Sequence, residues 1–118
     1  IRIQVRATVT DNNGTDTLTP ILNFGGTAIA TGAALDVNDS DVIWADAIVA
    51  VTAVGSSGTM TAHSEIRTDA VAATTVRATT ALTSKDTTGA LAIALNVDWS
   101  AAHAENIVRL DSFIVELI

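Results

Sequence analysis

The chain has 118 residues, 48% of them hydrophobic, and a formal net charge of −7. This length suits one domain with a core of its own, and the apolar content excludes a chain that is disordered by composition. Because cysteine is absent, disulfides, zinc–thiolate sites and thiol nucleophiles are excluded. Nucleic acids and anionic membranes attract cationic surfaces, so a total of six basic residues argues against both as partners.

The chain contains no apolar run near the ~18 residues that a membrane span needs. We therefore expect one β-rich domain over 1–118 that needs neither a membrane nor a cofactor. The sequence begins at Ile1, already within an alternating pattern. This start leaves open an N-terminal arm before the first strand.

The first half of the chain alternates apolar and polar residues, which is the period of a β-strand. Strands are predicted over 1–10, 18–24, 27–31 and 42–54. Turns are predicted at 11–14 and 25–26, since Asn and Gly tolerate a positive φ. Proline cannot donate to a ladder, so Pro20 predicts that its strand begins there or lies at an edge. Residues 32–41 are predicted as a polar loop, and 42–54 as a central strand that allows a bulge.

The second half repeats this pattern, with strands predicted over 59–67, 71–79, 90–99 and 107–118. Residues 55–58 form a turn, and 83–89 and 100–106 are polar loops; a single helical turn at 100–106, capped by Ser100, is the alternative. The alternation of 90–99 directs five side chains inward: Leu91, Ile93, Leu95, Val97 and Trp99. About eight evenly spaced strands predict an all-β fold, an antiparallel sandwich of the jelly-roll type.

An acidic loop holds the only candidate metal ligands that we single out: Asp36, Asn38, Asp39 and Asp41. Carboxylate and amide oxygens gathered in a loop suit Ca²⁺. The spacing departs from the twelve-residue calcium loop, because the sixth position lacks glycine and Ala47 occupies the twelfth. We therefore favour an Asp-rich turn before a strand over a metal site.

The sequence shows no catalytic motif. His63 and His103 are the only histidines, and neither accompanies the G-x-S-x-G turn of a serine hydrolase. In a strand, His63 and Ser64 point to opposite faces. We expect structural or surface roles for both histidines and no enzymatic activity. Trp44 and Trp99 stand in apolar patterns, so we expect both to anchor the core.

Four charged residues are candidates for contacts between subunits. Arg2 and Arg6 share one face of the first strand, and the alternative is a solvated sheet face. Asp46 and Asp98 interrupt apolar segments, so they are expected at a subunit contact or, more simply, in solvent or paired with arginine.

The order of strands and turns resembles small jelly-roll proteins of tailed-phage virions. The likeness rests on 18–22, 25–27, 35–41, 55–59, 90–102, 106–108 and 113–116. The end of the chain is most similar to the group, in which a W-S-A-A-x-x-x-N turn joins the last two strands, here from Trp99 to Asn106. The chain departs from this group in its alanines at 45–53, where bulkier residues are usual.

This resemblance implies a head decoration (cement) protein or a head or tail fibre subunit, located in the virion and commonly trimeric. Its partners would be copies of itself and other virion proteins such as the major capsid protein. The expected mechanism is burial of surface without chemistry, through apolar strand edges or the alanine-rich face. The alternative is a carbohydrate- or receptor-binding fibre module that uses the loops 11–17, 36–41 and 83–89 at one end of the sandwich.

Overall fold

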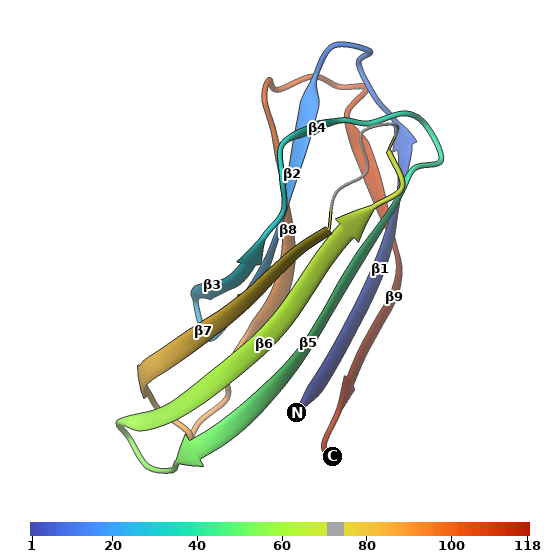
Figure 1. The fold of residues 1–118 in the computed structure, drawn as a ribbon. Coiled ribbons are helices and arrows are strands. Elements are labelled where there is room, and N and C mark those ends of the chain that lie inside the picture. Colours follow the sequence, from blue (N-terminus) through green and yellow to red (C-terminus); the bar gives the residue numbers. More distant parts are fainter. Residues whose placement is uncertain (71–74) are drawn as a thin grey trace.

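The computed structural model describes residues 1–70 and 75–118, and that part of the chain contains nine β-strands and no helix (Figure 1). The strands are β1 (Arg2–Asp11), β2 (Thr17–Phe24), β3 (Thr27–Thr31), β4 (Leu35–Asp36), β5 (Val42–Ala53), β6 (Gly58–Thr68), β7 (Thr75–Lys85), β8 (Ile93–Trp99) and β9 (Ile107–Glu116). The all-β prediction is confirmed. The start of the strand predicted over 71–79 lies outside the described residues. The helical turn proposed as an alternative at 100–106 is wrong.

The strands form two antiparallel sheets that pack face to face. The larger sheet has the order β7-β6-β5-β1-β9. In the smaller sheet β2 is central, with β8 on one side and β3 and β4 on the other. The late strands β9 and β8 thus pair with the early strands β1 and β2, so the two ends of the chain are neighbours in both sheets.

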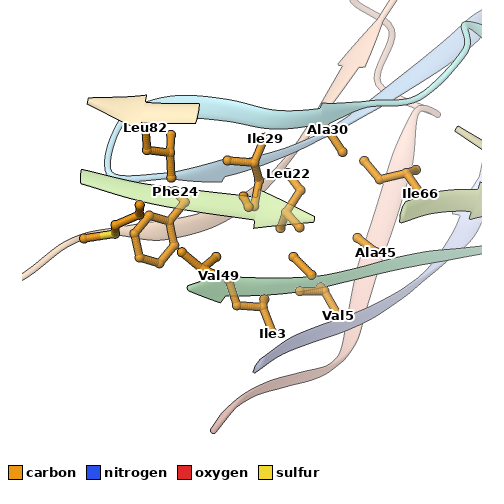
Figure 2. Close-up of a cluster of buried hydrophobic side chains, with 13 residues drawn as sticks. Ile3, Val5, Leu22, Phe24, Ile29, Ala30, Ala45, Val49, Ile66 and Leu82 are labelled. Carbon is orange, nitrogen blue, oxygen red and sulfur yellow. The ribbon is translucent and has the colours of Figure 1, made fainter. Parts of the chain in front are cut away.

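Alternation on each strand supplies the core between the sheets. Ile3, Val5 and Val9 of β1 are fully buried, as are Leu22 and Phe24 of β2. Figure 2 shows the side chains of these two strands and of β5 converging between the sheets. Complete burial of one such aliphatic side chain contributes about 1.5–3 kcal/mol.

Two of the four alanines of β5, Ala45 and Ala47, belong to this core, whereas Ala50 and Ala53 are exposed. Ala45 and Ala47 are 0% and 4% exposed and pack in the same cluster as Leu22, Phe24 and Ile29. Small residues on β5 therefore leave room for large residues on the opposite sheet. The inward-facing alanines are not available for the subunit contact considered from the sequence.

Pro20 departs from its predicted place, because it lies inside β2, the central strand of the smaller sheet. The reason is a break in the neighbouring edge. β3 pairs with β2 from Ile21 onward and β4 only at Thr17 and Leu18, so Pro20 has a ladder partner only on the other side, Val97 of β8. The Pro20 carbonyl accepts a hydrogen bond from the Gly32 amide at 2.8 Å, in the segment between β3 and β4.

The predicted hairpin turn at 25–26 is confirmed, whereas Asp11 of the turn predicted at 11–14 belongs to β1 and Gly14 has no positive φ. Gly25 and Gly26 have φ of 55° and 74°, the pair of positive values that a two-residue hairpin turn requires. The predicted loop at 83–89 is partly wrong, because β7 continues to Lys85. Its continuation pairs with β6 through a bulge, and the Lys85 ammonium donates to the Gly25 carbonyl at 2.8 Å.

The two sides of the sandwich differ. On one side β3 lies against β6 and β7: the Ser64 hydroxyl donates to the Ile29 carbonyl at 2.6 Å, and Thr80 donates to the same oxygen at 3.2 Å. On the other side β8 and β9 are both sheet edges, and no hydrogen bond joins them among the described residues. The sandwich is therefore closed along β3 and open along β8 and β9.

Candidate functional site

The inner face of β9 is defined by its register with β1. Val108, Leu110, Phe113 and Val115 stand opposite the buried residues Val9, Ala7, Val5 and Ile3. Directly opposed residues of two strands point to the same face, so these four side chains point toward the inside of the sandwich. Because of a bulge at Asp111, which adds one residue between Leu110 and Phe113, both of these side chains face inward.

These inward-facing side chains are nevertheless in contact with solvent. Leu110 is 57% exposed, Phe113 39% and Val115 47%. The smaller sheet ends at β8, so no strand of the described chain lies over β9. The result is an interior surface without a cover.

The facing strand β8 is also incompletely buried. Ile93, Leu95 and Val97 stand opposite the buried residues of β2 and therefore face inward as predicted, yet they are only half-buried. A cleft of about 230 Å³ lies between β8 and β9, with Ala7 among its lining residues. A second cleft, of about 380 Å³, continues it past Leu91 to Leu117.

We call this region the open side. It comprises the inward-facing residues Leu91, Ile93, Leu95, Val97, Val108, Leu110, Phe113 and Val115, with Leu117 beyond the strand. Three further apolar residues on or beside β9 are exposed as well: Ile107, Ile114 and Ile118. Contiguous exposed apolar surface of this kind marks an interaction site more often than scattered single residues do.

Polar contacts fix the bulge at the centre of β9. The Thr8 hydroxyl and the Arg109 Nε both donate to the Asp111 carboxylate, the latter at 2.7 Å. These hydrogen bonds, that from Thr8 first, hold the pKa of Asp111 below its usual range. The bulge that orients Leu110 and Phe113 is thus held by an ionised carboxylate.

The charged candidates from the sequence do not form one surface. Arg2, Arg6 and Asp46 lie on the outer face of the larger sheet, whereas Asp98 lies on the outer face of the smaller one. Arg2 pairs with Glu116 at 3.1 Å and Arg6 with Asp46 at 3.0 Å. These pairs fit the simpler alternative, in which the charges match one another across strands.

The outer face of the larger sheet also holds Trp44, which corrects its predicted core position. Trp44 is half-buried beneath the Arg67 guanidinium, whose carbon lies 4.9 Å from the ring centroid. The reason is the alternation of the strand: Ile43 and Ala45, on either side of Trp44, face the core, so Trp44 faces outward. Trp99 faces inward, as predicted, and packs against the second part of the core.

The acidic loop makes a turn. The Asp41 carboxylate accepts the Asn38 amide at 2.7 Å, and Ser40 takes a positive φ of 76°. Among the described residues, no three His, Cys, Asp or Glu side chains lie close enough together to hold a metal ion. The Asp41 carboxylate thus accepts a hydrogen bond from the backbone of its own loop. Asp36 and Asp39 are exposed.

The loops proposed for ligand binding lie at opposite ends of the sandwich, so that grouping is wrong. Residues 11–17 meet 36–41, where the Asn12 side chain donates to the Val37 carbonyl, and 100–106, where the Thr17 amide donates to the Ser100 hydroxyl. Residues 83–89 lie at the other end, where the Gly55 amide donates to the Thr87 hydroxyl at 2.7 Å. An antiparallel strand between successive loops places them alternately at the two ends.

The W-S-A-A-x-x-x-N turn is a clasp, a set of hydrogen bonds that holds two neighbouring loops together. The Asn106 side chain donates to Asp16 at 2.7 Å and to the Ala101 carbonyl at 3.1 Å, and it accepts the Asn13 amide at 2.9 Å. The Ser100 hydroxyl accepts the Thr17 amide at 2.9 Å. This motif therefore joins the β8–β9 loop to the β1–β2 turn.

The two histidines are separated in the fold. His63 lies exposed on the outer face of β6, with Nδ1 3.1 Å from the Thr79 hydroxyl. His103 lies in the β8–β9 loop, 3.8 Å from the Glu105 carboxylate, and both side chains are exposed. Neither contact places an enclosed nucleophile beside an imidazole.

No family model, curated protein or solved structure matches this chain. Within the described residues, no helix has the length and apolar character required to cross a membrane. The geometry of the open side is therefore the main guide to function.

Proposed function

We propose that the protein is a non-enzymatic structural subunit of a tailed-phage virion, a capsid decoration (cement) protein or head-fibre subunit that binds other proteins of the particle. The observation that carries this proposal is the open side, an apolar sandwich interior that the chain itself leaves in solvent. The resemblance to phage jelly-roll proteins supplies the virion as its setting.

The physical argument concerns what covers the open side. Each Å² of apolar surface removed from water contributes about 25 cal/mol, so Leu110, Phe113 and Val115 favour any state in which another protein covers them. Free sheet edges with apolar side chains associate readily. In a particle subunit, contact with neighbouring proteins along the open side would make this association specific.

The polar residues support binding over catalysis. The ion pairs of Arg2 and Arg6 stabilise the sheet, and the Asp41 carboxylate caps a turn. The remaining recognisable motif, ending at Asn106, serves the loop structure. The apolar surface, by contrast, has no partner within the described chain.

Mass spectrometry of purified phage particles that carry this gene tests the proposal. We expect peptides of this chain in the particle at a fixed ratio to the major capsid protein. Recovery of the chain only from the lysate, with particles that lack it, would refute a virion role.

A pair of variants tests whether the open side carries the binding. Leu110→Lys places a charge on the open side, and we expect its incorporation into particles to fall strongly. Val54→Lys is the matched control, because Val54 is 81% exposed in the β5–β6 turn and lines neither cleft of the open side. Equal incorporation of both variants would show that the particle is bound by another surface.

A further inference from the structure

The inward-facing side chains of β9 are arranged symmetrically about the middle of the strand. They stand at 108, 110, 113 and 115, and the midpoint of Ile107–Glu116 falls between Asp111 and Ser112. The bulge produces this symmetry. In a regular ten-residue strand, a two-fold rotation about the midpoint would place each inward-facing residue opposite an outward-facing residue of the second copy.

We propose that β9 pairs with β9 of a second copy of this chain, antiparallel and about a two-fold axis at that midpoint. Leu110 of one copy then stands opposite Phe113 of the other, and Val108 opposite Val115. Each inward residue meets an inward residue along the whole strand. The same surface patch serves both copies, as a two-fold contact requires.

The free edge of β9 has a bulge and three charged residues but lacks other devices that keep sheet edges apart. Edge strands are commonly protected by lysine, proline or a cover from another element. β9 contains neither lysine nor proline, and its apolar side chains are exposed on both faces. The opposite edge of the same sheet, β7, ends in Lys85 and has β3 packed against it.

Charge is compatible with the same register, in which Arg109 and Glu116 keep the pairs they form within their own chain, with Asp111 and Arg2. On the outer face, Arg109 stands opposite Ile114 of the second copy and diagonal to its Glu116, about 7–8 Å away between backbones, which long side chains can bridge. The two Asp111 carboxylates come close to the axis. Each is already held by its own Arg109 and Thr8, which offsets their repulsion.

This inference deepens the proposed function, on which it rests for the role of the open side, by naming a partner for β9. It also departs from the trimer implied by the resemblance, because a two-fold edge contact closes with two copies. Joined in this way, the two larger sheets form one continuous sheet of ten strands.

Light scattering of the purified protein measures the assembly directly. We expect a mass twice that of the 12.1 kDa chain, falling to that of one chain for Leu110→Lys and unchanged for Val54→Lys. A monomeric wild-type protein, or a trimer, would overturn the pairing. Either result leaves the virion proposal standing if the chain is found in particles.

Cross-linking tests the register. The chain has no cysteine, so Ser112→Cys introduces a single thiol. The proposed axis places the two copies of residue 112 within the roughly 4.4–6.8 Å between Cα atoms that a disulfide spans. We expect a covalent dimer on mild oxidation, and none for Thr79→Cys on the far edge strand β7. A dimer that fails to cross-link through residue 112 would contradict this register.

Discussion

Pro20 and Gly32 illustrate how single residues determine the smaller sheet. A Cβ atom on Gly32 would lie 2.7 Å from Cγ and 3.0 Å from Cδ of Pro20, and 3.2 Å from Cγ2 of Ile66. Glycine is therefore required by the close approach of the segment between β3 and β4 to the proline ring. The proline in turn occupies the one stretch of β2 that has no ladder partner on that side.

Gly32→Ala is expected to lower the free energy of unfolding by about 1–3 kcal/mol, because the added methyl group forces two packed segments apart. Urea denaturation measures this. Gly14→Ala is the matched control, since no atom lies within 4 Å of its Cβ position, and a change within about 0.5 kcal/mol is expected. Equal losses for the two variants would show that the contact with Pro20 is not the cause.

Asn106→Ala is expected to destabilise the protein by about 1–3 kcal/mol, because it leaves the Asp16 carboxylate, 7% exposed, without this donor. The neighbouring Glu105→Ala, at an exposed position, serves as the control in the same denaturation experiment. A stable Asn106→Ala protein would mean that the clasp between the two loops is dispensable.

At the scale of the element, β9 depends on its bulge. Asp111 holds the bulge through Thr8 and Arg109, and both hydrogen bonds lower its pKa. A carboxyl whose pKa is lower in the folded chain stabilises the fold above its ordinary value of 3.8. That contribution disappears as the pH falls through the lowered value.

The difference in unfolding free energy between the wild type and Asp111→Asn should therefore be largest at neutral pH and shrink below pH 3.8. Urea denaturation from neutral pH to about pH 2 measures it, and the other carboxyls cancel in the comparison. Thr8→Val, which removes the first donor, should reduce the same pH dependence. A difference that stays constant over this range would contradict the role given to Asp111.

Most strands followed from alternation, and the exceptions have physical causes. β4 has only two residues, Leu35 and Asp36, too few to show a period. The position of Pro20 depends on the gap between β3 and β4 along β2. The length of β7 depends on a bulge that accommodates Ser84. These are tertiary features, which the local pattern does not contain.

The open side was only partly predictable. The inward direction of Leu95 and Val97 followed from alternation, and apolar edges were expected to contact partners. The lack of a strand over β9 could not be read from the sequence, because it depends on which strands become edges. The remaining signal was the run 113–118, where apolar residues occupy both parities of a strand that ends the sheet.

At the scale of the whole molecule, one asymmetry dominates. The side along β3 is sealed by hydrogen bonds to β6 and β7, whereas the side along β8 and β9 exposes its interior. An isolated chain of this kind retains unfavourable contacts between apolar side chains and water. The proposed assembly would remove those contacts without any change in the fold.

Hydrogen exchange of the β9 amides tests most directly whether the open side is covered by another copy. In the wild-type protein at assembly concentrations, we expect residues 107–116 to exchange nearly as slowly as the central strand β5. In Leu110→Lys, β9 should exchange much faster while β5 is unchanged. Equally fast exchange of β9 in both proteins would mean that its edge stays free, and would contradict the account of the open side as a contact between copies.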